Sequence, residues 1–150
     1  MHPEVKSLIE HYHLQPLPIE GTLFASTYRS TQEYEGGKPV GTAMIGMYCD
    51  DPYSVSLFHK LKYDEVWHFY AGGSLTVHVL GETSIELSAG NPQAVVPAGR
   101  WFGATVAGEY ALVGCTVAPG FDFQDFEMGD RAALLREFPG QREIIERLTK

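Results

Sequence analysis

The middle of the chain, from Thr22 to about Glu127, consists of short runs rich in Val, Ile, Thr, Tyr and Phe that alternate with turn residues. Turn signals such as Glu35-Gly36-Gly37 and Ala118-Pro119-Gly120 separate these runs. Short strands spaced about 8–12 residues apart, without helices between them, predict an all-β sandwich or barrel. A parallel sheet would need crossover helices, for which there is no length. The predicted strands are Thr22–Ser30, Thr42–Cys49, Ser54–Leu61, Glu65–Tyr70, Ser74–Leu80, Thr83–Leu87, Gln93–Val96, Tyr110–Val117 and Phe121–Glu127.

Helical periodicity is confined to the two ends of the chain. Apolar residues between positions 5 and 12 recur at i, i+3, i+4 and i+7, and Pro3 suits a first helical turn. Near the C-terminus, Asp130 is a suitable N-cap for a helix over Ala132–Glu137, and a second apolar stripe follows at 144–148. We therefore expect short flanking helices that pack on the outside of the β body.

Length and charge narrow the class of protein. The chain has 150 residues, which is the usual size of one domain, so we expect a single domain over residues 1–150. It carries 11 Lys and Arg against 19 Asp and Glu, a net charge of −8, and has no basic run. Binding to a phosphate backbone or an anionic membrane surface needs such a run. The composition thus predicts neither a nucleic-acid partner nor a membrane partner.

The cysteines and the N-terminus predict a cytoplasmic protein. Cys49 and Cys115 are too few for a disulfide framework, and the first 14 residues lack the apolar core of a signal peptide. Cys115 lies mid-strand between apolar neighbours and is expected to be an inert core thiol. Two aspartates follow Cys49, so its thiol should ionise poorly and be a weak nucleophile.

Two stretches carry the candidate chemistry. In the first, His59 closes one strand, Glu65 opens the next, and Gly72 follows seven residues later. In the second, Pro97-Ala98-Gly99 forms a tight turn that places Trp101 and Phe102 on the following strand. Together they resemble the paired motifs of the cupin superfamily, in which the first motif contains two alternate His, a Glu and a Gly, and the second contains Pro-x-Gly before a third His.

The resemblance implies a metal centre that the residues here do not complete. Leu61 stands at the position of the second His, and Phe102 stands at that of the third. Catalytic metal sites usually have at least three protein ligands, so we expect no metal and no other cofactor. Alternation along the strand turns His68 away from Glu65 unless a bulge intervenes.

Most of the chain, from about Leu8 to Thr149, resembles one small cupin family of unknown function with sugar-epimerase-like relatives. The combination of Glu65–Phe69 with Val117–Phe123 carries this narrower resemblance. It implies a double-stranded β-helix, or jelly roll, with one pocket between its sheets, and commonly a homodimer. It implies no particular reaction, since a fold does not determine chemistry.

The expected pocket combines acid–base groups with aromatic walls, a common composition for small-molecule sites. His59 titrates near working pH and could share protons with Glu65, a pair suited to proton abstraction next to a carbonyl. Arg29 at the mouth could bind an anionic group or lie in a surface ion pair. The residues expected at the site are His59 and Glu65 as catalytic groups, and Trp67, Phe69, Trp101 and Arg29 as ligand-binding groups.

Three functions remain open at this point. The first is a metal-independent isomerase, epimerase or lyase acting on a small polar metabolite of the sugar- or nucleotide-like kind. The second is a non-catalytic protein that binds a small ligand through Trp67, Phe69 and Trp101. The third is a metal-dependent cupin with a degenerate site, in which His68 joins His59 and Glu65.

Overall fold

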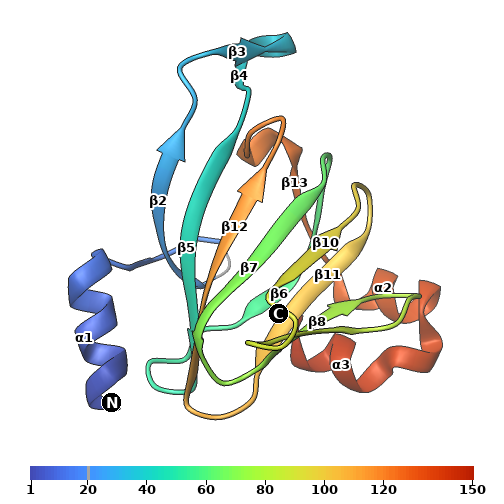
Figure 1. Ribbon diagram of the computed structural model, residues 1–150. Helices are drawn as coiled ribbons and strands as arrows, with labels where there is room; N and C mark the ends of the chain where they lie inside the picture. The colour runs from blue at the N-terminus through green and yellow to red at the C-terminus, as the bar shows by residue number, and fades with distance from the viewer. Residues whose placement is uncertain (20) are drawn as a thin grey trace.

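The computed structural model describes residues 1–19 and 21–150, and its main strands form two antiparallel β-sheets that face each other (Figure 1). The larger sheet has the strand order β1 (Gln15–Pro16), β2 (Leu23–Arg29), β5 (Thr42–Cys49), β12 (Tyr110–Val117), β7 (Glu65–Gly72) and β10 (Gln93–Val96). The smaller sheet has the order β13 (Phe126–Met128), β6 (Ser56–Leu61), β11 (Trp101–Val106), β8 (Leu75–Val79) and β9 (Ile85–Leu87). The predicted all-β architecture is confirmed.

A small hairpin extends beyond the two sheets, at the top of Figure 1. It consists of β3 (Glu33–Tyr34), the 3-10 turn η1 (Glu35–Gly37) and β4 (Lys38–Pro39), and it connects β2 to β5. The turn uses Gly36 and Gly37 at φ of 78°, a left-handed conformation that favours glycine. The Gly-Gly pair therefore forms the turn that the sequence indicated.

The predicted last strand is the main difference from the expected elements. Residues 123–125 form a 3-10 turn, η2, because the Asp122 side chain accepts a hydrogen bond from Gln124 N and caps it. Only Phe126–Met128 then pairs with β6, as β13. The strand β11 was foreseen only as the strand that receives Trp101 and Phe102; it pairs with both β6 and β8.

The helices cover the outer faces of the two sheets, as expected, and lie on opposite sides of the molecule in Figure 1. Helix α1 (Pro3–Tyr12) packs on the larger sheet through a cluster that includes Val5, Met47 and Leu112. Helices α2 (Arg131–Glu137) and α3 (Arg142–Arg147), with the 3-10 turn η3 (Pro139–Gln141) between them, pack on the smaller sheet. The predicted N-cap is confirmed, since the Asp130 carboxylate accepts a hydrogen bond from Ala133 N.

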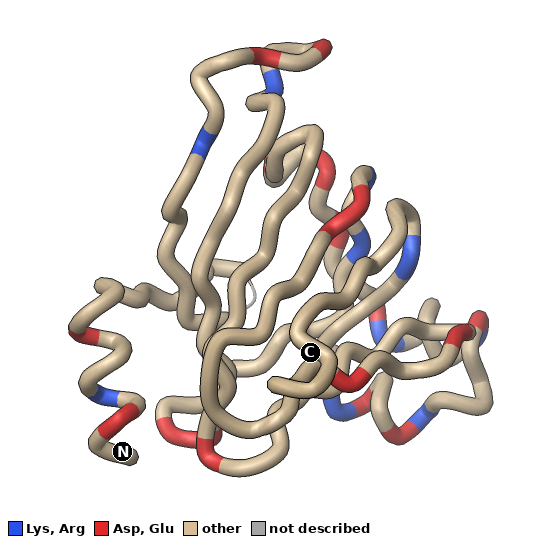
Figure 2. The backbone as a smooth tube through the Cα atoms, in the orientation of Figure 1, with Lys and Arg blue, Asp and Glu red and all other residues tan. Residues whose placement is uncertain are grey.

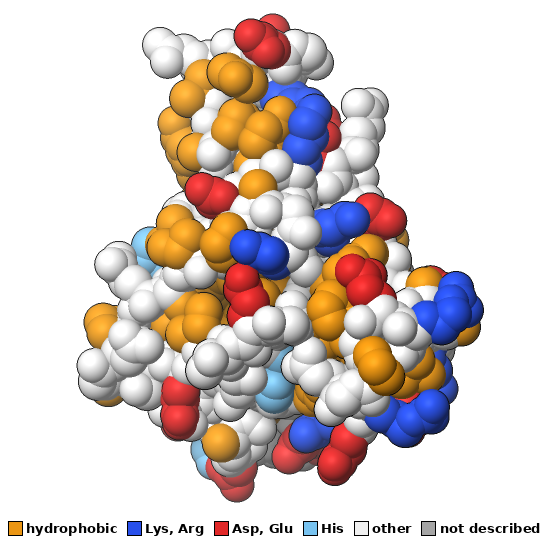
Figure 3. All heavy atoms as spheres, turned by 90° about the vertical axis from the view of Figure 1, so that its right-hand side faces the viewer, with side chains coloured by type: hydrophobic (Ala, Val, Ile, Leu, Met, Phe, Trp, Pro, Cys, Tyr) orange, Lys and Arg blue, Asp and Glu red, His pale blue; other side chains and the backbone are white. Residues whose placement is uncertain are grey.

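Charged residues lie mainly on turns and helices, while the strands in the middle of both sheets are largely uncharged (Figure 2). On the face that carries β10, β11 and the C-terminal helices, cationic and anionic side chains lie side by side (Figure 3). Ion pairs such as Arg100–Glu82 at 3.2 Å and Arg142–Glu146 at 2.8 Å account for this mixture. Within the described residues, no helix is long and apolar enough to cross a membrane.

The core fills one side of the space between the sheets. Buried side chains of β7, β10 and β12 meet those of β8 and β11 there, and the largest are Trp67, Phe102 and Leu75. Toward β2 and β5 the space between the sheets is not filled, and the residues of β2 that face inward line a cavity instead. The fold thus places a hollow next to a well-packed core.

His78 gives the fold a predicted acid sensitivity. It lies on the outer face of β8, with Nε2 2.9 Å from Thr105 Oγ1. Burial, and then the charge of Arg147, lower the pKa of His78 below its usual value of 6.5. As the pH falls below that value, the unfolded chain binds more protons at this site than the folded chain does, so the free energy of unfolding decreases. We expect the variant His78→Gln to lose less stability than the wild type between about pH 7 and about pH 5.

Urea unfolding at these two pH values measures this difference directly. A change in stability with pH that is the same for both proteins would contradict the prediction.

Candidate functional site

An interior cavity of about 220 Å³ lies between the sheets on the side of β2 and β5. It is smaller than the range of about 300–1,000 Å³ that drug-sized ligands occupy, which fits a small metabolite. Four of the six predicted site residues line the cavity: His59, Glu65, Trp67 and Arg29. The interior cavity is therefore the candidate functional site.

The register of the larger sheet explains how its side chains reach the cavity. Two adjacent rows of paired residues cross β2, β5, β12 and β7 and present their side chains to the interior. One row is Arg29, Thr42, Val117 and Glu65, and the next is Ser26, Met44, Cys115 and Trp67. The charged groups thus occupy the two ends of one row, with Thr42 and Val117 between them.

A β-bulge brings Arg29 into its row. The pairing of β2 with β5 shifts between Ser26 and Tyr28, so that Arg29 pairs with Thr42. Without the shift, alternation from Ser26 would turn Tyr28 inward and Arg29 outward. Arg29 is exposed and lies at the open end of the interior cavity.

His59 is held in one orientation and one tautomer. It is 5% exposed, and its Nδ1 lies 2.7 Å from the carbonyl oxygen of Leu57. A carbonyl only accepts hydrogen bonds, so Nδ1 carries a proton, and in the neutral imidazole the lone pair is therefore on Nε2. The ring centroid is 4.2 Å from that of Phe102 and 5.0 Å from that of Phe126, with which the ring is nearly parallel. This arrangement fixes the ring orientation and makes Nε2 the basic nitrogen of the neutral tautomer.

Glu65 and Trp67 enter the interior cavity from the opposite sheet. Glu65 is 7% exposed and begins β7, while His59 lies on β6, so the two groups approach from facing walls. Trp67 is 1% exposed and stacks on Tyr48 at 6.0 Å with an interplanar angle of 20°. Among the described residues, the indole Nε1 of Trp67 has no hydrogen-bond partner. The wall therefore contains a buried polar group whose bonding capacity is unused.

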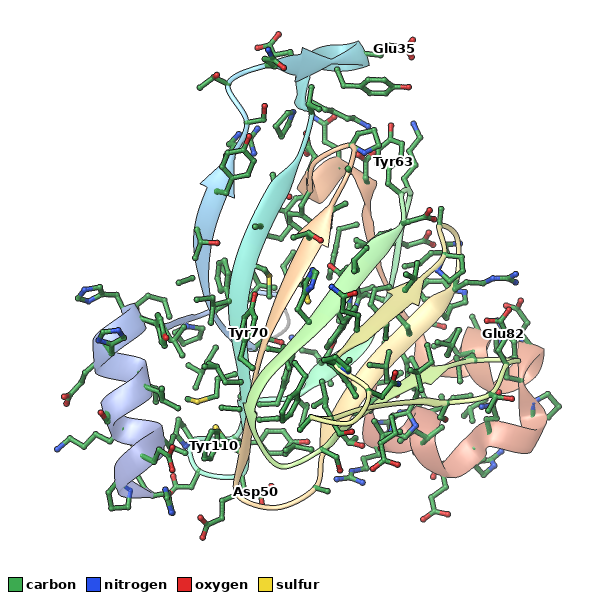
Figure 4. The ribbon with its side chains drawn as sticks, in the orientation of Figure 1. Glu35, Asp50, Tyr63, Tyr70, Glu82 and Tyr110 are labelled. Carbon is green, nitrogen blue, oxygen red and sulfur yellow. The ribbon has the colours of Figure 1, made fainter. Side chains whose placement is uncertain are left out.

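An aromatic wall that the sequence analysis did not include covers one side of the interior cavity. Phe121, Phe123 and Phe126 form edge-to-face pairs at centroid distances of 5.0, 6.1 and 5.9 Å. The segment is anchored by Asp125, whose carboxylate lies 2.6 Å from Lys38 Nζ on the hairpin, and this hydrogen-bonded pair raises the pKa of Lys38. Lys38 Nζ also lies 5.1 Å from the ring of Tyr63, labelled in Figure 4 at the same end of the sheets.

Phe69 and Trp101 do not line the interior cavity, and the expectation that they would is corrected. Trp101 is the first residue of β11 and lies on the outer face, because Phe102 takes the inward position. Its ring packs toward the C-terminal helices and has Lys60 Nζ 4.7 Å from its centroid. Phe69 pairs with Val113 one row beyond Trp67, where it packs against the filled core.

The residues present do not fit a three-ligand metal centre. Leu61 and Phe102 occupy the two remaining ligand positions as buried core residues. His68 is turned away from the cavity, as alternation predicted, and its Nε2 lies 3.1 Å from Thr116 Oγ1. The described part of the chain has no group of three or more His, Cys, Asp or Glu side chains arranged to hold a metal ion.

The two thiols are expected to be unreactive in the folded protein. Cys49 is fully buried, and burial, followed by the charges of Asp50 and Asp51, raises its pKa to about 11. Cys115 is 3% exposed in the wall of the cavity. At about pH 8 iodoacetamide should therefore label the native protein slowly and label both cysteines in urea. Mass spectrometry counts the alkylated thiols, and rapid labelling of the native protein at Cys49 would refute this prediction.

A double-stranded β-helix with an interior cavity is the class of protein that this geometry defines. The chain belongs to the Cupin superfamily (DUF985), whose family description matches residues 6–129. It is similar to protein SO0799 from Shewanella oneidensis, with 34% identity over 97% of this chain and 96% of that chain and a TM-score of 0.89. It is also similar to a hypothetical protein from Leishmania major, with 28% identity over 96% and 97% of the two chains and a TM-score of 0.84.

A more distant structure supports the fold alone. An uncharacterized conserved protein with a double-stranded β-helix domain from Klebsiella pneumoniae has 17% identity over 81% of this chain and 94% of that chain, with a TM-score of 0.59. A search of curated proteins finds no match. The predicted cupin family and jelly-roll fold are confirmed, while the function rests on the site itself.

Proposed function

We propose that this chain is an isomerase, epimerase or lyase that works without a bound metal on a small polar metabolite in the interior cavity. The observation that carries the proposal is the fixed tautomer of His59. The bond between Nδ1 and the Leu57 carbonyl leaves Nε2 as the basic nitrogen of the neutral ring, and the ring lies in a buried, aromatic environment. A positioned neutral imidazole is the usual general base at working pH.

The proposed step is proton abstraction from a carbon next to a carbonyl. His59 Nε2 takes the proton, the electron pair of the C–H bond moves toward the carbonyl, and an enolate forms. Glu65 in its carboxylic acid form returns a proton to the opposite face of the same carbon and is left as the carboxylate, which inverts the carbon, since the two groups lie on facing sheets. Loss of a β-substituent from the enolate instead gives elimination. The pair therefore supports either epimerisation or lysis by the same first step.

Deuterium exchange tests the proposed step without knowledge of the product. The protein is incubated in D₂O with a panel of small oxo- and hydroxycarboxylates, sugars and sugar phosphates, and NMR follows the C–H signals next to carbonyl groups. We expect at least one compound to lose such a signal, and to lose it at the same rate after the protein is treated with EDTA.

The other outcomes separate the alternative functions. Binding in a thermal-shift assay without exchange would support the non-catalytic ligand-binding protein. Exchange that EDTA abolishes and a divalent ion restores would support the metal-dependent enzyme. Absence of both binding and exchange across the panel would overturn the proposal for these classes of metabolite.

A further inference from the structure

The open end of the interior cavity gathers groups that can donate hydrogen bonds to an anion. Arg29 and Thr42 are cross-strand partners there, and Ser26 is the inward-facing residue of the next row on β2. Thr42 Oγ1 accepts a hydrogen bond from Phe121 N at 2.9 Å, so the hydroxyl hydrogen of Thr42 is still available to donate. A guanidinium with a hydroxyl beside it is suited to a carboxylate or phosphate group.

Arg29 forms no ion pair with another side chain in the described part of the protein. Four other Lys and Arg side chains of the described residues form ion pairs: Lys38–Asp125, Lys60–Glu127, Arg100–Glu82 and Arg142–Glu146. The chain has 19 Asp and Glu against 11 Lys and Arg, so acidic side chains that could pair with a cation are in excess. Within residues 1–19 and 21–150, Arg29 makes neither an ion pair nor a hydrogen bond through its side chain and instead lines the cavity.

The sheet register separates the two charged groups that line the cavity. Arg29 and Glu65 lie at the ends of one row across four strands, and three strand spacings separate their Cα atoms by roughly 14 Å. Both side chains leave the same face of one sheet, so they project into the cavity side by side rather than toward each other. The apolar side chains of Met44, Cys115 and Val117 lie along this interval, and the cavity volume of about 220 Å³ limits the ligand to a small molecule.

We propose that the substrate of this cavity is a short-chain organic anion, whose carboxylate or phosphate group binds Arg29 and Thr42 while its reacting carbon lies between His59 and Glu65. The part of this proposal that places the reacting carbon between His59 and Glu65 rests on the proposed function. It selects small linear anions over nucleotide-linked sugars, which a cavity of about 220 Å³ does not contain.

Binding of a matched pair of probes tests the charge requirement. The probes are hexanoate and hexanamide, which have the same chain length and differ in charge, together with hexyl phosphate and shorter and longer carboxylates. We expect hexanoate to bind the wild type roughly ten- to a hundredfold more tightly than hexanamide, with a preference that weakens as salt is added. Affinity should fall for carboxylates whose chains are too long for a cavity of about 220 Å³. Isothermal titration calorimetry measures each affinity.

The variants Arg29→Gln and Arg100→Gln form a matched comparison. Arg29→Gln should remove the preference for hexanoate over hexanamide, whereas Arg100→Gln, which changes a surface Arg paired with Glu82, should retain it. Tighter binding of hexyl phosphate than of hexanoate, with the same dependence on Arg29, would identify the anion as a phosphate ester. Equal binding of the acid and the amide, no binding of any probe, or a preference that survives Arg29→Gln would each overturn the proposal.

This result is separable from the test of the proposed function. Deuterium exchange with an uncharged compound would support acid–base chemistry and contradict the anion requirement. Anion binding that depends on Arg29, with no exchange in any compound, would support the ligand class and contradict the chemistry.

Discussion

Replacing His59 with glutamine is expected to lower the rate of deuterium exchange by about 10²- to 10⁴-fold, which is the usual contribution of a general base. Glutamine approximates the size and polarity of the imidazole but has no nitrogen that can take a proton at neutral pH. Ligand affinity should change much less, because the aromatic wall of Phe121, Phe123 and Phe126 is unaltered. NMR exchange rates and calorimetric affinities on the same protein samples separate the two effects.

The protein contains histidines that serve as controls for this substitution. His68 and His78 lie outside the interior cavity, where they contact Thr116 and Thr105 respectively. His68→Gln and His78→Gln should therefore exchange at the wild-type rate. An His59→Gln protein that is folded and exchanges as fast as these controls would remove His59 from the catalytic role.

The parts of the site that follow from simple alternation could be predicted from the sequence. Glu65 and Trp67 are two residues apart on one strand, so they share the inward face, and His68, which follows Trp67, takes the outward one. The terminal helices were also predictable, because their apolar periodicity and the Asp130 cap are local signals. Local patterns of this kind need no knowledge of which strands become neighbours.

The rest of the site depends on register and on contacts between distant segments. Trp101 was predicted to line the pocket, but which face of the sheet its side chain takes depends on where the turn after Pro97 ends and β11 begins. Arg29 faces the cavity through a bulge that no single-strand pattern reveals. The aromatic wall comes from a segment predicted as a strand, although the alternation of Phe121 and Phe123 was a visible signal.

The second large effect concerns the Gly-Gly turn between β7 and β8, where we expect Gly73→Ala to destabilise the fold by about 3 kcal/mol or more. A Cβ at position 73 would lie 1.9 Å from the carbonyl oxygen of Ala107, a backbone atom that cannot rotate away. Hydrogen bonds also join this turn to the turn between β11 and β12, from Gly73 N to Tyr110 O at 2.8 Å and from Ala107 N to Ser74 O at 2.9 Å. Relief of the clash would therefore break the contact that joins them.

Gly140→Ala provides the matched control for this loss of stability. An added Cβ at position 140 meets no atom within 4 Å, so its free energy of unfolding should stay within about 0.5 kcal/mol of the wild type. Thermal unfolding should show a melting temperature roughly 6–12 °C lower for Gly73→Ala, on the usual scaling for a chain of this size. The interior cavity lies between the same two sheets, so the ligand affinity of Gly73→Ala should also be lower than that of the wild type. A Gly73→Ala protein as stable as Gly140→Ala would show that the two turns do not approach as closely as described.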